Sequence, residues 1–423
     1  MTKPALSLNP APPEGGVWPT PGQELLLQAA LLEAPAAPQA WQRWKAIERT
    51  DLLDQASWKL LPTTYLNLTR LGVHDSLVDE ARTIHRHYWA RNQTHFHRSR
   101  QFLEELKSLE IPALVLKGVA LSHLYYRDGG ARPMADLDLL VPADKFSFLA
   151  KYLVQNGWQE GEDFSFIYFD QDAFPSFEFR RNDGFSVDLH AHVLHTDCRK
   201  EADAPFWDRA CSWDFKGHPA LTLCPEDHLL HAVSHGVAWN PVPPCRWIVD
   251  VWWILHATGS AFKWDRVIEQ ARFHQNALWI YHGLERMQKI VPLDLPTGVL
   301  DELKSTPATM KRRINFAYAL LPRPLKAADR IKSVWKELEK DEPNTSSARK
   351  LANFRDYLME AWGVSSVFLL PFVAGLKVVN FFWHKFRIYA TPHPQLKYVL
   401  PPIRAAILFW SKLGDWFRHK PAP

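Results

Sequence analysis

Two kinds of hydrophobic pattern alternate along the chain. Apolar residues recur at helical spacing through 23–100, and again from LCPEDHLLHAVSHGVAW onward to about residue 290. Between these regions, short apolar runs such as IPALVLKG and ADLDLLV end at turn residues, which is typical of buried strands. Aromatic alternation in FSFIYF and in SFEFRRNDGFSVDLHAHVLH predicts further strands, with NDG as a hairpin turn. The pattern therefore predicts an α+β fold, with a mixed β-sheet and flanking helices embedded between N- and C-terminal helical regions.

The same pattern divides the chain into regions of different character. We expect a disordered Pro/Gly-rich arm at 1–22, an N-terminal helical region at 23–100, a sheet-containing core at 101–215, a helical domain at 216–345, and apolar or basic C-terminal helices at 346–423. The composition is 47% hydrophobic, enough for a substantial core. The 4 cysteines form no C-x-x-C pair, which argues against a zinc ribbon and fits a reducing compartment. With no secretory pattern at the N-terminus, we expect a cytoplasmic protein.

The C-terminal region is both apolar and basic. WGVSSVFLLPFVAGLKVVNFFWHKF is interrupted by Pro371, Gly375 and Lys377, and from Lys377 onward there are eight basic residues and one acidic residue. Three interpretations stay open: helices packed on the body, a helix pair at 362–420 lying on an anionic membrane surface, or a membrane span. The second would place the protein peripherally at the inner membrane. Because this tail carries the excess of the +4 net charge, the body is not basic, and nucleic acid is not an expected partner.

The segment ARPMADLDLLVP places two carboxylates on one predicted strand. Successive strand residues face opposite sides, so Asp136 and Asp138 point the same way while the leucines beside them point into a core. Two carboxylates on one face repel each other unless a cation lies near them. The structural interpretation is an ion pair with Lys117 or Arg132, and the functional one is a bound metal ion.

The strand FSVDLHAHV repeats this arrangement. Val187 and Leu189 form its apolar face, and Asp188 and His190 lie on its polar face. If this strand neighbours the one that carries Asp138, the carboxylates converge. Mg²⁺, with Mn²⁺ as an alternative, takes oxygen ligands of this kind, and it could activate a hydroxyl and stabilise a departing phosphate. His190 could act as a general base or orient a ligand.

The turn at Lys117 and Gly118 follows a predicted strand and begins a predicted helix. Glycine would allow a phosphate to approach the backbone, the helix N-terminus offers free N–H groups, and lysine adds a charge. The alternative is an ordinary turn between a strand and a helix.

The order of four features resembles the nucleotidyltransferase fold of the DNA polymerase β superfamily. These features are L-K-G, a predicted helix, R-P-x-x-D-x-D followed by apolar residues, and V-D-L-H. The closest likeness is to bacterial uncharacterised nucleotidyltransferase-like proteins, which carry K-G in place of G-S. The resemblance covers about 111–193 and implies an NTP substrate, Mg²⁺ ligation by Asp136, Asp138 and Asp188, and triphosphate contacts from a further three residues. These three are Lys117, Gly118 and Arg132. Position 119 is Val, so the hydroxyl of the wider superfamily is absent.

EDHLLHAVSHGVAW places three histidines on one helix face. His228, His231 and His235 could form a zinc site with Cys224, line an acceptor pocket beside the sheet, or serve packing and capping. Asp250 is either a partner for Arg246 or a residue of the same acceptor pocket.

Three functions remain open from the sequence. The first is Mg²⁺-dependent transfer of a nucleotidyl group from an NTP to an unidentified acceptor. The second is a catalytically weak nucleotide-binding or scaffold protein at a membrane-associated assembly. The third is a D-x-D glycosyltransferase, which would not account for Lys117–Gly118 or for Asp188.

Overall fold

The computed structural model describes eight stretches of the chain. These are residues 16–47, 53–126, 128–160, 176–238, 240–320, 347–362, 367–369 and 371. The chain forms two units, the first of which is 1–308 with 316–324 and the second 309–315 with 325–423. The expected strand FSFIYF, most of the expected N-terminal arm and most of the C-terminal region lie outside the described residues.

Helices make up most of the described structure. In the first part of the chain they are α1 (Pro21–Leu31), α2 (Ala36–Ile47), α3 (Gln55–Arg70), α4 (Ser76–Ser108), α5 (Lys117–Leu124), α6 (Ala143–Gln155) and α7 (Ala204–Asp208). Then follow α8 (Pro225–Gly236), α9 (Arg246–Thr258), α10 (Trp264–Phe273), α11 (Ala277–Ile290), α12 (Val299–Ser305), α13 (Met310–Ala319) and α15 (Ser347–Trp362), with 3₁₀ turns at Gly259–Ala261 and Val367–Leu369.

A single mixed sheet lies in the first unit. Its strands are β1 (Leu114–Val115), β2 (Leu137–Leu140), β3 (Gln159–Glu160), β4 (Ser176–Arg180), β5 (Ser186–His190), β6 (Cys211–Phe215) and β7 (His218–Thr222). Among the described residues the order is β3-β4-β5-β2-β1-β7-β6. The central strand β2 pairs in parallel with β5, and β1 pairs antiparallel with β2 and in parallel with β7. The expected mixed-sheet α+β class is therefore confirmed.

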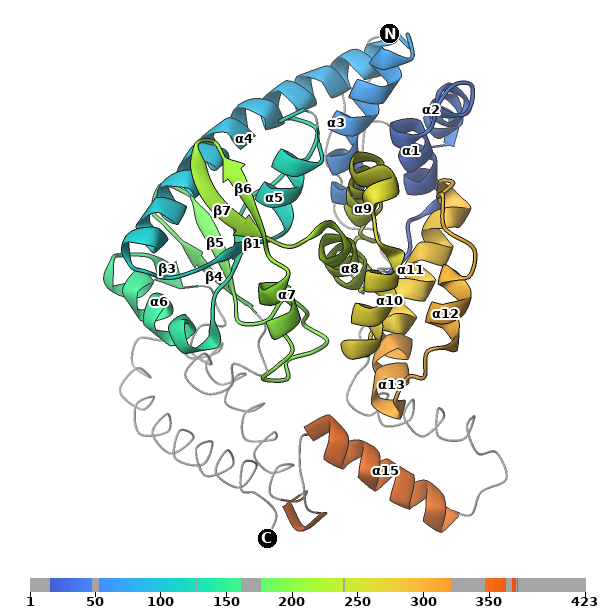
Figure 1. Cartoon of the computed structure of the whole chain (residues 1–423). Coiled ribbons are helices and arrows are strands. Elements are labelled where there is room, and N and C mark those ends of the chain that lie inside the picture. Colours follow the sequence, from blue (N-terminus) through green and yellow to red (C-terminus); the bar gives the residue numbers. More distant parts are fainter. Residues whose placement is uncertain are drawn as a thin grey trace, which may run out of the picture. The chain divides into compact units, whose positions relative to one another are not determined.

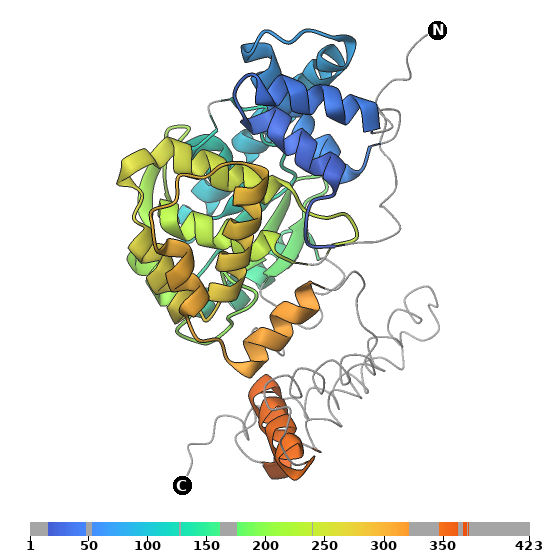
Figure 2. The ribbon, with the colours of Figure 1, turned by 90° about the vertical axis from the view of Figure 1, so that its right-hand side faces the viewer.

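The two faces of the sheet pack against different helices (Figures 1 and 2). On one face, Leu137, Leu139, Val187 and Leu189 join a core with apolar residues of α4 and α6. On the other face, Leu140 joins the core formed by the N-terminal helices and by α8–α11. Because strand residues alternate, Asp138 and Asp188 lie on the face that is turned toward this second, larger group of helices.

Carboxylates and a hydroxyl cap the N-terminal helices and fix where they begin. The Thr20 side chain accepts from the Gln23 N–H in a capping box, and Asp54 and Asp75 each accept two backbone N–H bonds at the starts of α3 and α4. The expected helical region at 23–100 is thus formed by α1–α4. The last of these continues to Ser108, past the expected boundary, because its apolar face follows the sheet.

Two expected boundaries differ from the structure. The β6–β7 hairpin crosses the expected core limit at residue 215, because β7 pairs with β1 and belongs to the same sheet. The expected helical domain at 216–345 does not form a separate unit, since α8–α12 share a core with α1–α3. No helix in the described part of the chain is long and apolar enough to cross a bilayer.

Candidate active site

Asp138 and Asp188 lie directly opposite each other on neighbouring parallel strands. The register pairs Asp138 with Asp188 and Leu140 with His190. Ligand atoms of Asp138, Asp188 and His190 all lie within 4.8 Å of one another. The sequence-based expectation that the two acidic strands are neighbours is confirmed.

The ammonium group of Lys117 lies among these three side chains. Its Nζ is 2.7 Å from Asp138 Oδ1 and 3.7 Å from Asp188 Oδ2. It is also 3.2 Å from His190 Nε2. The cation that the acidic strand pair requires is therefore supplied within the chain.

The pKa values of the cluster follow from this arrangement. Burial alone would raise the pKa of Asp138, but the Lys117 ammonium and the hydrogen bond to His190 lower it far below its usual range. Burial acts against the charge of Lys117 as well, yet Asp138 and Asp188 raise the pKa of that amine. At neutral pH the cluster thus holds a charged amine between ionised carboxylates.

The ring orientation of His190 fits a ligand role. Its Nδ1 is 3.3 Å from the backbone oxygen of His192, and in the neutral ring Nδ1 donates to that oxygen. Its Nε2 faces the carboxylates, 3.1 Å from Asp188 Oδ2 and 3.3 Å from Asp138 Oδ1; protonated, this nitrogen donates to them, and deprotonated it offers a lone pair to a cation. A backbone partner on the far nitrogen is the usual support of a metal-binding histidine. Burial and Lys117 lower the pKa of His190, and Asp188 and Asp138 raise it by more.

Lys117 adopts a backbone conformation that is unfavourable for a residue with a side chain. Its φ is 40°, in the left-handed region, and it begins helix α5 without a side-chain cap at Leu116. Such a residue costs about 1–2 kcal/mol relative to the right-handed conformation. The strained turn directs the amine to the carboxylates and leaves the first N–H groups of α5 without a capping side chain.

Close packing explains why position 118 is a glycine. A Cβ there would lie 3.2 Å from Arg132 Nη1 and 3.3 Å from Met134 Cβ. The next residue, Val119, is fully buried in the core under the sheet, so a hydroxyl at that position would not face the carboxylates.

Arg132 is paired with Asp250. Its Nε and Nη2 donate to the two oxygens of Asp250 at 2.7 and 2.9 Å, and Tyr126 donates to Asp250 Oδ1 at 2.6 Å. Arg132 and Asp250 are 3% and 4% exposed. Of the two expectations for Asp250, a partner role holds, but the partner is Arg132 and not Arg246. The sequence offered no signal for Tyr126.

Asp136 precedes β2 and lies outside the group of three ligand residues. Strand β2 starts at Leu137, so the D-x-D pair is not held on one strand as expected, although Asp136 interacts electrostatically with Asp138, Asp188 and Lys117. Burial and the charge of Asp138 raise its pKa. Its backbone oxygen is 2.8 Å from His95 Nε2, which holds the segment before β2 against α4.

The histidines of α8 fall into two groups. His228 is directed to Thr222, whose hydroxyl donates to the Val115 oxygen at 2.6 Å and accepts from His228 at 3.1 Å. It serves packing. His231 and His235 lie edge to face at 6.3 Å, and His235 lies similarly at 6.5 Å from His195, a residue that the sequence did not single out.

Both His231 and His235 interact electrostatically with Lys117. Burial lowers the pKa of His231 well below its usual value. His235 is open to solvent, and the charge of Lys117 is the leading cause that lowers its pKa. None of the three α8 histidines belongs to a cluster of potential metal ligands in the described residues, so the structure does not support a zinc site at these histidines.

Comparison with known proteins assigns the chain to a family. Residues 45–292 match the family model of the uncharacterised nucleotidyltransferases, which is more than half of the chain, and the chain belongs to this family. No curated protein matches it. A solved structure, an antigenic nucleotidyltransferase-like protein from Paracoccidioides brasiliensis, matches with 14% identity over 51% of this chain and 94% of its own. Its TM-score of 0.29 is too low to say anything of this fold.

Proposed function

We propose that the protein transfers a nucleotidyl group from an NTP to a hydroxyl acceptor in a Mg²⁺-dependent reaction. The observation that carries the proposal is the parallel register that places Asp138 opposite Asp188, with His190 at the same point of the sheet. Membership of the nucleotidyltransferase family supports the class of reaction.

The donor set suits a hard divalent cation. Asp138 and Asp188 supply carboxylate oxygens and His190 a ring nitrogen, while Asp136 stands close enough to contribute through its charge. A bound Mg²⁺ or Mn²⁺ would lower the pKa of an acceptor hydroxyl and balance charge on the phosphates. Because the Lys117 ammonium lies 2.7 Å from Asp138 Oδ1, we propose that it moves away from this oxygen when the carboxylates hold a metal.

The withdrawn amine has a second partner available in the reaction. Lys117 begins α5, and the N–H groups of that first turn lack a side-chain cap, so an anion there would meet both a positive helix end and an ammonium group. We assign the Lys117–Gly118 turn to the phosphates of the NTP, with Arg132 as the residue that holds the turn from behind.

In the proposed reaction the acceptor oxygen attacks the α-phosphorus of the NTP. An O–P bond forms, the bond between the α-phosphorus and the bridging oxygen to the β-phosphorus breaks, and pyrophosphate leaves. The hydroxyl proton passes to a carboxylate. Asp188 suits this role better than Asp138, because its side chain is 20% exposed and that of Asp138 only 4%.

The acceptor side of the site would be formed by α8. His235 is open to solvent and neutral, and His231 lies beside it, so both can hydrogen-bond a hydroxyl-bearing molecule without repelling a cation. Asp250 acts here only through Arg132. We further propose that the protein is cytoplasmic and that residues 362–420 bind anionic membrane surfaces; flotation with anionic liposomes tests this against a chain that ends at Glu360.

Nucleotide binding tests the proposal. Titration calorimetry with each common NTP in Mg²⁺ should show binding to the wild-type protein, and the Asp138→Asn/Asp188→Asn double variant should lose the Mg²⁺-dependent part. Equal Mg²⁺-dependent affinity in both proteins would overturn the assignment. Binding without any product would favour a nucleotide-binding protein whose Lys117 keeps the carboxylates neutralised.

A further inference from the structure

Two positively charged side chains flank the segment that leads into β2. Lys59 lies on α3 and Arg246 begins α9, and both are half-buried. Neither has an ion-pair partner within the described residues. A half-buried cation without an ion-pair partner loses hydration, and no hydrogen bond to a described residue replaces it for Lys59. Their position next to a proposed phosphate site calls for a functional explanation.

Hydrogen bonds tie both helices to the same loop. Thr63 lies one turn after Lys59 on the same face of α3, and its hydroxyl donates to the Ala131 oxygen at 3.0 Å. Arg246 Nη1 donates to the Pro133 oxygen at 2.7 Å. The loop from Ala131 to Asp136 is therefore held between α3 and α9, with a cation on either side.

The electrostatics of the pair support this interpretation. Lys59 interacts with Arg246, Arg132 and Asp136, and burial followed by the charge of Arg246 lowers its pKa to about 8. Burial, followed by the charge of Arg132, lowers the pKa of Arg246 as well. Asp136 is the only carboxylate among the groups that act on Lys59 in the described chain, whereas both Asp250 and Asp136 favour the charge of Arg246.

We propose that Lys59 and Arg246 form a binding subsite for the β- and γ-phosphates of the NTP, which also receives the pyrophosphate product. An anionic ligand would replace the lost hydration of both side chains and remove their mutual repulsion. The subsite lies beside Asp136, which interacts electrostatically with Asp138 and Asp188, so a triphosphate bound there would extend toward these carboxylates. This inference rests on the proposed function and assigns the N-terminal helices a part in substrate binding.

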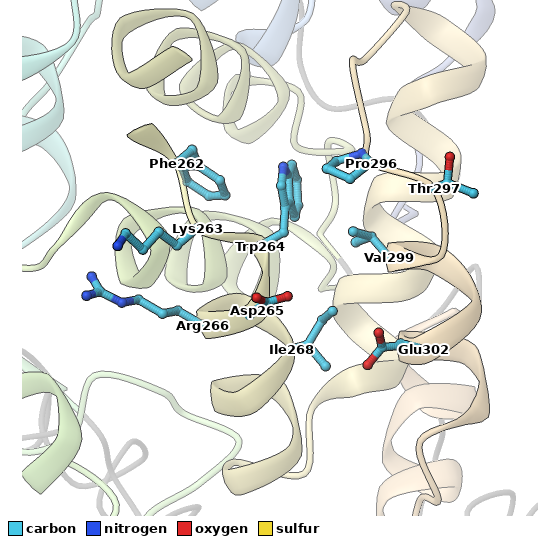
Figure 3. Close-up of a pocket in the computed structure, with 10 residues that line it drawn as sticks. All are labelled: Phe262, Lys263, Trp264, Asp265, Arg266, Ile268, Pro296, Thr297, Val299 and Glu302. Carbon is cyan, nitrogen blue, oxygen red and sulfur yellow. The ribbon is translucent and has the colours of Figure 1, made fainter. Parts of the chain in front are cut away.

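A different cationic surface offers a matched control. Lys263 and Arg266 line a concavity of about 420 Å³ between α10 and the segment that leads into α12, together with Pro296 and Glu302 (Figure 3). Here Arg266 has a carboxylate partner, because it lies 3.7 Å from Glu226 Oε2, and Asp265 lines the same concavity. Loss of these two charges should not affect pyrophosphate binding.

The test is titration of the full chain with inorganic pyrophosphate in EDTA, so that no metal ion contributes. We expect the wild-type protein to bind, and Lys59→Gln and Arg246→Gln each to weaken binding about tenfold or more. Lys263→Gln/Arg266→Gln should leave the affinity unchanged. Lys59 donates no hydrogen bond to any residue that the structure describes, so Lys59→Gln should keep or raise the melting temperature, which excludes misfolding as the cause.

Two results would overturn the inference: no pyrophosphate binding by the wild-type protein, or equal binding by wild type and Lys59→Gln. The proposed function fails separately. If pyrophosphate binding depends on Lys59 but no NTP is turned over, the subsite stands and the reaction does not. If NTP is turned over equally well by Lys59→Gln, the reaction stands and the subsite does not.

Discussion

Lys117 Nζ lies 2.7 Å from Asp138 Oδ1, so the most deeply buried carboxylate of the site carries its counter-ion within the chain. The amine is held there by a strained backbone, with φ of 40°, at the first residue of α5. Strained residues cluster at active sites and ligand-binding sites, so this strain supports the hypothesis of a functional role for the amine. We interpret this arrangement as a resting state in which lysine occupies the place of a cation.

The first prediction separates the two aspartates of the D-x-D pair. Asp138→Asn removes the carboxylate that pairs with the buried Lys117 ammonium. Breaking a buried ion pair in this way costs about 3–5 kcal/mol of unfolding free energy. Asp136 is repelled by Asp138 and partly exposed, so Asp136→Asn should change stability by no more than about 0.5 kcal/mol or raise it. Urea unfolding of both variants measures the difference. Equal losses would contradict the ion pair.

The second prediction concerns competition between Lys117 and the metal. Removal of the amine in Lys117→Gln leaves the carboxylates of Asp138 and Asp188 without a counter-ion, so a metal should neutralise them more readily. The rise in melting temperature caused by Mg²⁺ should be larger in the variant than in the wild type, while NTP turnover should fall. Lys289→Gln, at an exposed position on α11, is the matched control. A smaller Mg²⁺ effect in Lys117→Gln would show that the amine assists the metal.

The third prediction is a pH dependence of stability that comes from His228. Burial lowers its pKa in the folded protein to about 3, whereas an unfolded histidine titrates near 6.5. Between these values only the unfolded chain binds the proton, so the folded state loses stability as the pH falls below about 6.5. At pH 5 this amounts to about 2 kcal/mol. His228→Gln keeps a donor for Thr222 and should remove that part of the slope in urea unfolding between pH 7 and 5; an unchanged slope would contradict it.

The fourth prediction concerns the packing of α8 on α9. A Cβ on Gly236 would lie 2.1 Å from Trp247 Cγ, so Gly236→Ala must push away the residue next to Arg246. We expect a loss of about 1–3 kcal/mol in stability and weaker pyrophosphate binding. Gly16→Ala is the control, since its Cβ would make only an ordinary contact, 3.7 Å from Pro243 Cγ. Equal stability of the two variants in urea would contradict this packing.

The sequence predicted the carboxylate pairing well because it depends on strand alternation and neighbouring strands. Alternation alone was enough to place Asp138 on the polar face of one strand, and Asp188 and His190 on the polar face of another. The position of Asp136 could not be predicted, because β2 begins at Leu137, two residues after the start of the expected strand ADLDLLV, and strand ends depend on pairing partners.

The sequence could not predict which distant residues contact each other in the folded protein. Arg132 and Asp250 are separated by 118 residues, and nothing local to either indicates that they pair. Lys59 lies in an ordinary amphipathic helix, and only its packing brings it to Asp136. Lys117 was expected both as a counter-ion and as a phosphate ligand, and the structure places it as the former.

One measurement tests the central claim most directly. The purified protein is incubated with Mg²⁺ and each NTP labelled at the α-phosphate in cell lysate, and the label is traced into new species beside the Asp138→Asn/Asp188→Asn double variant. We predict label transfer with at least one NTP by the wild-type protein, release of pyrophosphate, and no transfer by the variant. Transfer of equal extent by both proteins, or none with any NTP, would contradict a carboxylate-centred nucleotidyl transfer at this sheet.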